Sequence, residues 1–284
     1  MKNPKETARK ILNAVKTVPV LSSSAGRILQ IIDSSNPSIA ALVNIIRNDS
    51  PLTANILKAA NSAFYGLRSE VSSIDQAVPL IGIDEVVRIA LRSGVSDVFE
   101  KELTGYKGVA GEFWKHDLRA AIASHKIASY GRIYISPEIA FTGGLLHDIG
   151  KAIVSSYLGD VSKKIVEAID RGVVKDFHEA EKRLLGVDHA MVGFEVARHW
   201  NLPEILQNII RYHHTPSEAP EMFKPIVYCV HLGDILAMMA GYGTGSDTLY
   251  YPLDDRYSDF IDLSEDELHL LILEIDEKFE QVNY

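Results

Sequence analysis

The sequence predicts an all-α protein, and three observations support this fold class. Apolar residues recur at intervals of three and four along most of the chain, which is the spacing of one helix face. Capping side chains stand directly before prolines at several points, which is typical of helix starts. The β-branched runs, such as residues 133–135, are too short and alternate too little to require a sheet.

Individual helices are marked by caps and by apolar spacing. Starts are predicted at three capping pairs, Asn36-Pro37, Ser50-Pro51 and Ser136-Pro137. The apolar positions between residues 39 and 46 fall on one helix face. Near the end of the chain, Ser264 and Glu267 form a capping box ahead of the apolar run 268–272, which predicts a final helix.

Glycine-rich stretches mark the expected boundaries. Residues 104–111 contain three glycines and separate two long helical stretches. Residues 241–262 carry glycine, tyrosine and aspartate without helical periodicity, and they are expected to form an ordered loop. The sequence therefore predicts an N-terminal helical bundle in 1–105, a second helical domain in 106–240, and a loop with a C-terminal helix in 241–284.

The composition is that of an ordinary globular protein. Of 284 residues, 46% are hydrophobic and 24% are charged, which is enough to bury a core. The net charge of −9, without a basic stripe, argues against nucleic acid as a partner, although small anionic ligands remain compatible with a bound metal. No run of about 18 uncharged apolar residues or signal peptide is visible, so no membrane span is expected. The single Cys229 lies in an apolar run and predicts a buried thiol in a reducing cytoplasm.

A histidine/aspartate constellation in the second half is the strongest chemical signal. His147 and Asp148 lie in the run Gly143–Lys151, where the carboxylate could bridge two cations through its two oxygens. Glu112 and His116 are four residues apart and share a helix face. Further candidate ligands are His189, His213, His214 and Asp234. A charged residue such as Asp234 in an apolar helix needs a partner, which a metal would supply.

These motifs resemble two related families. The order His…His-Asp…His…His-His…Asp, with Leu-Leu-His-Asp-Ile-Gly-Lys at 145–151, resembles the HD superfamily of metal-dependent phosphohydrolases. Residues 49–66, Asp-Ser-Pro-Leu-Thr-Ala-Asn-Ile-Leu-Lys-Ala-Ala-Asn-Ser-Ala-Phe-Tyr-Gly, resemble the hallmark of HDOD modules, the HD-related output domains of bacterial signalling proteins. The runs 72–82 and 186–203 continue that pattern. The resemblance covers most of residues 10–240 and implies an HD-type helical domain preceded by an N-terminal helical bundle.

The resemblance also implies a ligand set. By similarity to the HD-GYP branch, which hydrolyses cyclic di-GMP, one metal would take His116, His147, Asp148 and Asp234. The other would take His189, His213 and His214, with Asp148 bridging. Glu112 matches a carboxylate that some members use for a third ion, although an exposed glutamate favoured by the helix dipole explains it as well. The expected cofactors are two divalent ions of iron, manganese or zinc.

Two functions remain open at this point. The first is a signalling module that acts through contacts with a partner protein. The second is a phosphohydrolase in which Asp148 bridges the metals and Lys151 contacts a phosphate, although Lys151 could instead be a solvated side chain. Many HDOD modules have lost ligands, whereas the full set is retained here. Residues 215–220 replace the glycine-tyrosine-proline motif of the HD-GYP branch, so cyclic di-GMP is not the expected substrate.

The expected partners are a signalling protein, a small phosphorylated ligand, or both, without nucleic acid or membrane. Two further interpretations concern single residues. Asn61–Gly66 could form a partner-binding patch, but the preferred interpretation is a helix end whose aromatics are packed between subdomains, so Phe64 is predicted to be buried. His231 shares a helix face with Asp234 and is expected to support the ligands, whereas His178 has no partner pattern.

Overall fold

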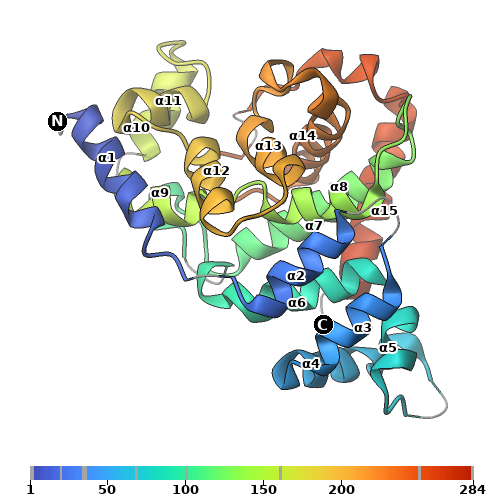
Figure 1. Cartoon of the computed structure of the whole chain (residues 1–284). Helices are drawn as coiled ribbons and strands as arrows, with labels where there is room; N and C mark the ends of the chain where they lie inside the picture. Colours follow the sequence, from blue (N-terminus) through green and yellow to red (C-terminus); the bar gives the residue numbers. More distant parts are fainter. Residues whose placement is uncertain are drawn as a thin grey trace. The chain divides into compact units, whose positions relative to one another are not determined.

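The computed structural model describes residues 3–19, 21–33, 37–67, 70–99, 102–159, 162–248 and 251–282. The described chain is all-α, as predicted, and its β pairing is confined to an isolated bridge between Gly131 and Ile261 (Figure 1). The α-helices in chain order are α1 (Pro4–Val15), α2 (Ser23–Ile32), α3 (Ile39–Arg47), α4 (Ser50–Ala60), α5 (Ile74–Ile81), α6 (Ile83–Phe99), α7 (Glu112–Ala128), α8 (Pro137–Leu146), α9 (Lys151–Leu158), α10 (Ser162–Asp170), α11 (Phe177–Leu185), α12 (His189–His199), α13 (Glu204–Tyr212), α14 (Lys224–Met239) and α15 (Glu265–Val282).

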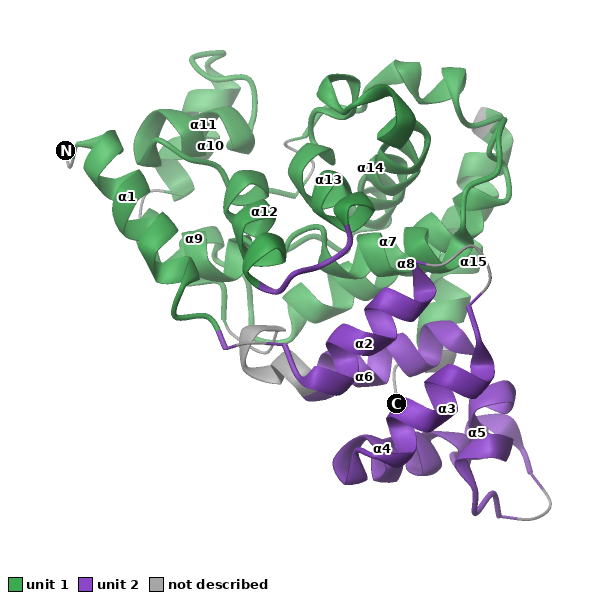
Figure 2. Cartoon of the chain, in the orientation of Figure 1, with its two compact units in different colours: residues 1–18, 97–199, 204–284 green, residues 19–96, 200–203 purple. Residues whose placement is uncertain are grey.

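The chain divides into two compact units (Figure 2). Unit 1 comprises residues 1–18, 97–199 and 204–284, and unit 2 comprises residues 19–96 and 200–203.

Helix α1 belongs to unit 1, whereas the sequence places it with the N-terminal bundle. Its buried residues Thr7, Ile11 and Val15 are four apart and form one stripe, and the helix packs with α9, α11 and α12. Gly186, with φ of +75°, lies so close to the carbonyl of Pro4 that an added Cβ would come within 2.6 Å of its oxygen. The spacing of a stripe shows that a helix is covered, but it does not say which helices cover it.

Unit 2 holds α2 to α5 and most of α6, and its helix starts follow the predicted capping chemistry. Ser22, Ser38 and Asp49 cap α2, α3 and α4, each accepting a hydrogen bond from the backbone N–H three residues further on, at 3.0–3.3 Å. A helix does start at the predicted pair Ser50-Pro51, but its capping residue is Asp49 and Ser50 is the first helical residue, so the predicted cap is one position off. Asn36 lies outside the described residues.

The turn at Asn61–Gly66 belongs to unit 2, and its aromatic side chain is not buried as predicted. Residues Ala63–Tyr65 form a 3-10 turn that ends at Gly66, with φ of +55°. The Asn61 side chain holds this turn by donating to the Val71 carbonyl at 2.8 Å and accepting from the Val71 N–H at 2.7 Å. Phe64 is 43% exposed, so the prediction of a buried Phe64 is wrong. Hydrogen bonds between the Asn61 side chain and the Val71 backbone, rather than ring burial, hold the turn.

The core of unit 1 is built on α7, which packs against α8 and α14. Glycine makes both contacts close, because an added Cβ at Gly144 would lie 2.7 Å from the Ala121 Cα, and one at Gly233 would lie 2.3 Å from the Ser124 Oγ. The start of α8 at Ser136 is confirmed by its cap on Ile139, and the Ser264–Glu267 capping box of α15 is formed. Close packing of these helices positions the histidine and aspartate side chains described below.

One described helical segment, Glu221–Met239, is long and apolar enough to cross a membrane by length and composition. It consists of a 3-10 turn, Glu221–Phe223, followed by α14. However, 83% of its most apolar window is buried inside the protein. The composition of this segment is therefore that of a buried core helix.

Candidate metal centre

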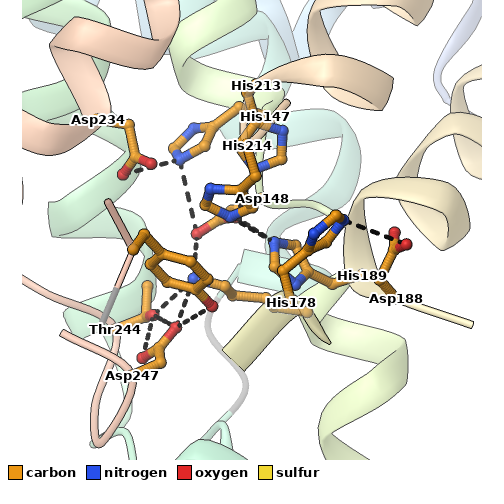
Figure 3. A network of polar contacts seen from close by, with 12 residues as sticks. His147, Asp148, His178, Asp188, His189, His213, His214, Asp234, Thr244 and Asp247 are labelled. Carbon is orange, nitrogen blue, oxygen red and sulfur yellow. Dashed lines mark hydrogen bonds and ion pairs between the residues drawn. The ribbon is translucent and has the colours of Figure 1, made fainter. Parts of the chain in front are cut away.

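Asp148 lies at the centre of a buried histidine/aspartate cluster in unit 1 (Figure 3). The residues of the cluster lie in helices or directly after them. His116 is in α7 and Asp234 is in α14. His147 and Asp148 follow α8, His189 opens α12, and His213 follows α13. Each of these six residues is at most 2% exposed. His214 is partly exposed. The structure thus brings together residues that lie more than 100 positions apart in the sequence.

The two carboxylate oxygens of Asp148 face different histidine pairs. Its Oδ1 lies 3.4 Å from the Nε2 atoms of both His189 and His213. Its Oδ2 lies 3.6 Å from the Nε2 of His147 and 3.8 Å from that of His116. The Asp234 Oδ1 is 3.1 Å and 3.4 Å from the Nε2 atoms of His116 and His147. This is the arrangement in which one carboxylate can serve two cations.

The imidazole rings are oriented by partners on their outer nitrogens. The Nδ1 atoms of His116, His147 and His213 lie 2.6–2.9 Å from the carbonyl oxygens of Tyr242, Gly144 and Ile210. Because a carbonyl only accepts, each Nδ1 carries a proton, and a neutral ring then has its lone pair on Nε2. Among the described residues, these three buried Nε2 atoms have no hydrogen-bond partner. Inward lone pairs with outer nitrogens held by carbonyls are typical of metal-binding histidines.

His189 and His214 add a second indication of a shared cation. The Nδ1 of His189 lies 2.8 Å from Glu181 Oε2, and the backbone N–H of His189 donates to the same oxygen at 2.7 Å. The Nε2 of His189 lies 2.9 Å from the Nε2 of His214. Two imidazole lone pairs at this distance repel each other unless a proton or a metal ion lies between them. The atoms of Asp148, His189, His213 and His214 are close enough together to hold one metal ion.

The electrostatics of the cluster favour cations. Burial alone would lower the pKa of His147, but Asp148 and Asp234 raise it to about 9. Burial also opposes the charged form of His189, yet Glu181 and Asp148 raise the pKa of that ring to about 10. Burial lowers the pKa of His213 to about 4. Although burial acts to raise the pKa of Asp148, Lys151 and His147 hold it well below its usual range. The carboxylates of Asp148, Asp234 and Glu181, which stabilise the protonated imidazoles, would also attract divalent cations.

Gly150 ends the turn after His147-Asp148, and its φ of −66° is one that any residue can adopt. An added Cβ there would lie 2.0 Å from the carbonyl oxygen of His189 and 2.6 Å from the N of Gly193. Gly150 therefore allows the start of α12, which carries His189, to lie directly against the turn that carries Asp148.

Two candidates from the sequence, Glu112 and Lys151, are not among the side chains that surround Asp148 as possible metal ligands. Glu112 is 39% exposed at the start of α7 and pairs with Lys115 at 3.0 Å. Two groups of described residues could each hold a metal ion: Asp148, His189, His213 and His214 form the first, and His116, Asp117, His147 and Asp148 form the second. Glu112 and Asp234 both lie outside these groups, but Asp234 is 3.1 Å from His116, whereas Glu112 pairs with a lysine. Lys151 is only 2% exposed, so its alternative as a solvated side chain is wrong. The Lys151 Nζ lies 2.6 Å from Asp148 Oδ2 and 2.7 Å from Asp247 Oδ2. Its contact with a substrate phosphate stays a prediction.

Sequence reasoning missed several buried polar residues around the cluster. Asp117, on α7, joins His116, His147 and Asp148 in the second candidate group, and both its oxygens lack a hydrogen bond among the described residues. The sequence could have indicated Asp117, because it follows His116 just as Asp148 follows His147. His178 is buried and lies 3.2 Å from Asp188, with its ring 5.7 Å from that of His214.

The supporting role expected for His231 agrees with its contacts. Its Nδ1 donates to the His213 carbonyl at 2.7 Å, and its Nε2 accepts from the Asp254 N–H at 3.0 Å. His231 thus fixes the backbone beside one candidate ligand.

The described residues form an all-α protein with buried His/Asp clusters that could hold a metal ion. The model of the HDOD domain matches residues 18–216, and the chain belongs to the HDOD domain family. The crystal structure of an HDOD domain protein of unknown function from Geobacter sulfurreducens is similar, with a TM-score of 0.70 and 25% identity, covering 98% of this chain and 95% of that one.

Two further relatives extend the comparison. A protein from Marinobacter aquaeolei VT8, assigned provisionally to signal transduction, has a similar crystal structure, with a TM-score of 0.78 and 18% identity over 98% of this chain and 64% of that one. An uncharacterized protein from Treponema pallidum (strain Nichols) is 26% identical over 224 residues. That match spans 78% of this chain but only 42% of the relative's length.

Proposed function

We propose that this chain is an HDOD signalling module that holds two divalent transition-metal ions, iron, manganese or zinc, and transmits a signal to a partner protein from the cytoplasm. One observation carries the metal part of the proposal. The two oxygens of Asp148 face separate pairs of buried imidazoles, and the Nε2 atoms of three of these rings, His116, His147 and His213, point inward without hydrogen bonds among the described residues. Buried polar atoms are rarely left unpartnered, so this donor set fits metal ions better than it fits an empty core.

The residues divide into two groups around Asp148. His116, His147 and Asp234 would hold one ion, with Asp117 as an additional carboxylate. His189, His213 and His214 would hold the other. The ions would supply positive charge able to polarise a phosphoryl oxygen or a bound water. The chain itself orients the imidazoles through the carbonyls of Gly144, Ile210 and Tyr242 and through Glu181.

The test is elemental analysis of protein purified without chelator. We expect close to two transition-metal ions per chain in the wild type and in the control Asp255→Asn, which changes an exposed carboxylate of the same charge. Asp148→Asn should lose a large part of this metal, because it removes the charge shared by both groups. A high-resolution density map with only water among these side chains, from crystals grown with metal and without chelator, would refute the proposal.

A working phosphohydrolase is the second candidate function, favoured by the retained donor set and by Lys151 beside Asp148. Signalling is preferred because six of the seven candidate ligands, all except His214, are at most 2% exposed and the Lys151 ammonium is already paired with two carboxylates. A substrate phosphate would have to displace one of these partners.

A further inference from the structure

The segment after α14 covers the metal centre with its own polar groups. We define the capping segment as residues 242–248 and 251–254. The Tyr242 carbonyl accepts from His116 at 2.6 Å, and the Tyr251 ring stacks on His214 with centroids 4.0 Å apart and planes 13° apart. The capping segment therefore contacts both candidate metal groups.

The capping segment is seated on residues 103–108 by close backbone contacts. Both the N–H and the hydroxyl of Ser246 donate to the Tyr106 carbonyl, at 2.6 Å and 2.8 Å. Gly245 has φ of +146°, and an added Cβ would lie 2.2 Å from the same carbonyl oxygen. An added Cβ at Gly108 would lie 2.1 Å from the Thr244 carbonyl oxygen. These glycines allow a closeness that no other residue would, so the seating is a specific one.

The seated segment delivers the carboxylate of Asp247 to Lys151. Asp247 is 1% exposed, and its Oδ2 lies 2.7 Å from the Lys151 Nζ. The Tyr251 hydroxyl donates to the same oxygen at 3.1 Å, and the Thr244 hydroxyl lies 2.9 Å and 3.0 Å from the two oxygens. One ammonium and two hydroxyls around a buried carboxylate form a set of donors that would suit a phosphoryl group equally well.

The charges around Lys151 explain why an anion is needed at the position of the Asp247 carboxylate. Lys151 also contacts Asp148 at 2.6 Å, and Asp148 is the carboxylate that both metal groups share. If Asp148 bound metal ions, its negative charge would be shared with them, and it would neutralise the Lys151 ammonium less. The buried Lys151 would then need a second anion to balance its charge. Asp247 is placed to be that anion.

We propose that Asp247 is a built-in anionic ligand, which fills an oxyanion subsite on Lys151 beside the metal centre, and that a phosphoryl ligand must displace it to bind. This inference rests on the proposed function for its biological meaning, because the subsite serves the metal centre. The contacts that form the subsite, however, are made by protein groups alone. The capping segment is therefore self-inhibitory: it keeps anionic ligands away from Lys151 until Asp247 leaves.

The test uses inorganic phosphate as the probe and isothermal titration calorimetry on the full chain. The variants are Asp247→Ala, which empties the position, and Asp247→Asn, which keeps the shape without the charge. Asp255→Ala is the matched control, since Asp255 is exposed in the turn that follows the capping segment. Circular dichroism shows which variants are folded. If Asp247→Ala does not fold, Asp247→Asn decides.

We expect phosphate to bind the Asp247 variants about ten- to a hundredfold more tightly than the wild type or Asp255→Ala, the range that hydrogen bonds to a charged group are worth. Adding Lys151→Met to Asp247→Ala should abolish the gain. The titrations are run on metal-loaded and on chelator-treated protein, with metal content measured separately. A gain in phosphate affinity, in a protein that takes up no metal even after loading, would refute the proposed function and keep the subsite. Two bound metals with an unchanged phosphate affinity in a folded Asp247 variant would overturn the subsite and keep the proposed function.

Discussion

At the scale of single residues, Glu181 determines how His189 faces the centre. Its Oε2 holds both the Nδ1 and the backbone N–H of His189, and its Oε1 accepts from the Tyr106 hydroxyl at 2.5 Å. Glu181→Gln should lower metal affinity by about ten- to a hundredfold, because carboxylates that orient metal-binding histidines typically contribute that much. Competition with a chelator measures the effect, and Glu167→Gln, an exposed site on α10, is the control. Equal affinities in the two variants would contradict this role.

Proton release on metal binding follows from the raised pKa values of His147, about 9, and His189, about 10. Without metal, both rings are charged at neutral pH, and their ion pairs stabilise the fold fully below the unfolded pKa of about 6.5 and lose this effect as pH rises through 9 to 10. A metal must displace these protons from Nε2. Metal titrations at pH 7 in buffers of different ionisation enthalpy should therefore show proton release. Metal affinity should rise with pH up to about 10, and a pH-independent affinity would count against binding at these rings.

The sequence could predict the principal members of the cluster but not its surroundings. Residue types and order indicate His116, His147, Asp148, His189, His213, His214 and Asp234, and the structure brings these seven together. Glu181, His178 and Asp247 were missed because their roles depend on contacts with residues that are distant in the sequence or on other helices. Lys151 could be a surface side chain from its sequence alone. Its 2% exposure in the folded chain shows that Lys151 is buried.

At the scale of helices, the close contact between α7 and α8 sets the distance between His116 and His147. Gly144→Ala would place a Cβ 2.7 Å from the Ala121 Cα and 2.8 Å from the Ala120 carbonyl oxygen, so the two backbones must move apart. The expected loss is about 1–3 kcal/mol of unfolding free energy, the usual range for overpacking, together with reduced metal content.

The control for this prediction is Gly26→Ala in α2, whose added Cβ meets only Leu21 at 3.9 Å. Replacing that helical glycine should stabilise the protein by about 0.5–1 kcal/mol. Chemical denaturation followed by helical circular dichroism measures both variants. A Gly144→Ala protein as stable as the wild type would show that the α7–α8 contact is more tolerant than its geometry indicates.

The sequence predicted where helices begin better than it predicted which surfaces those helices pack against. Caps such as Ser136 and the Ser264–Glu267 box act over three residues, so the sequence shows them directly. The packing of α1 in unit 1 and the exposure of Phe64 depend on which surfaces meet. Apolar spacing does not contain that information.

At the scale of the whole molecule, the candidate centre extends beyond the family match. The HDOD match ends at residue 216, whereas Asp234 and the capping segment lie after it. Three groups of the centre thus come from the chain that follows the match. They are the candidate ligand Asp234, the Tyr242 carbonyl that orients His116, and the Asp247 carboxylate that pairs with Lys151. The family identity alone therefore does not determine whether anions reach this centre.

The last prediction concerns catalysis. We expect the wild-type chain, loaded in turn with iron, manganese or zinc, to hydrolyse neither cyclic di-GMP nor a panel of nucleotides and aryl phosphates. Apart from the partly exposed His214, the candidate ligands around Asp148 are at most 2% exposed, and the ammonium that would hold a phosphoryl oxygen is bound to Asp148 and Asp247. Phosphate release measured over the panel is the assay, with Asp148→Asn as the reference for contaminating activity. Turnover by the wild type that Asp148→Asn abolishes would establish a phosphohydrolase, because a contaminant would not respond to a substitution in this chain. Rapid turnover of cyclic di-GMP would further show that residues 215–220 can replace the glycine-tyrosine-proline motif.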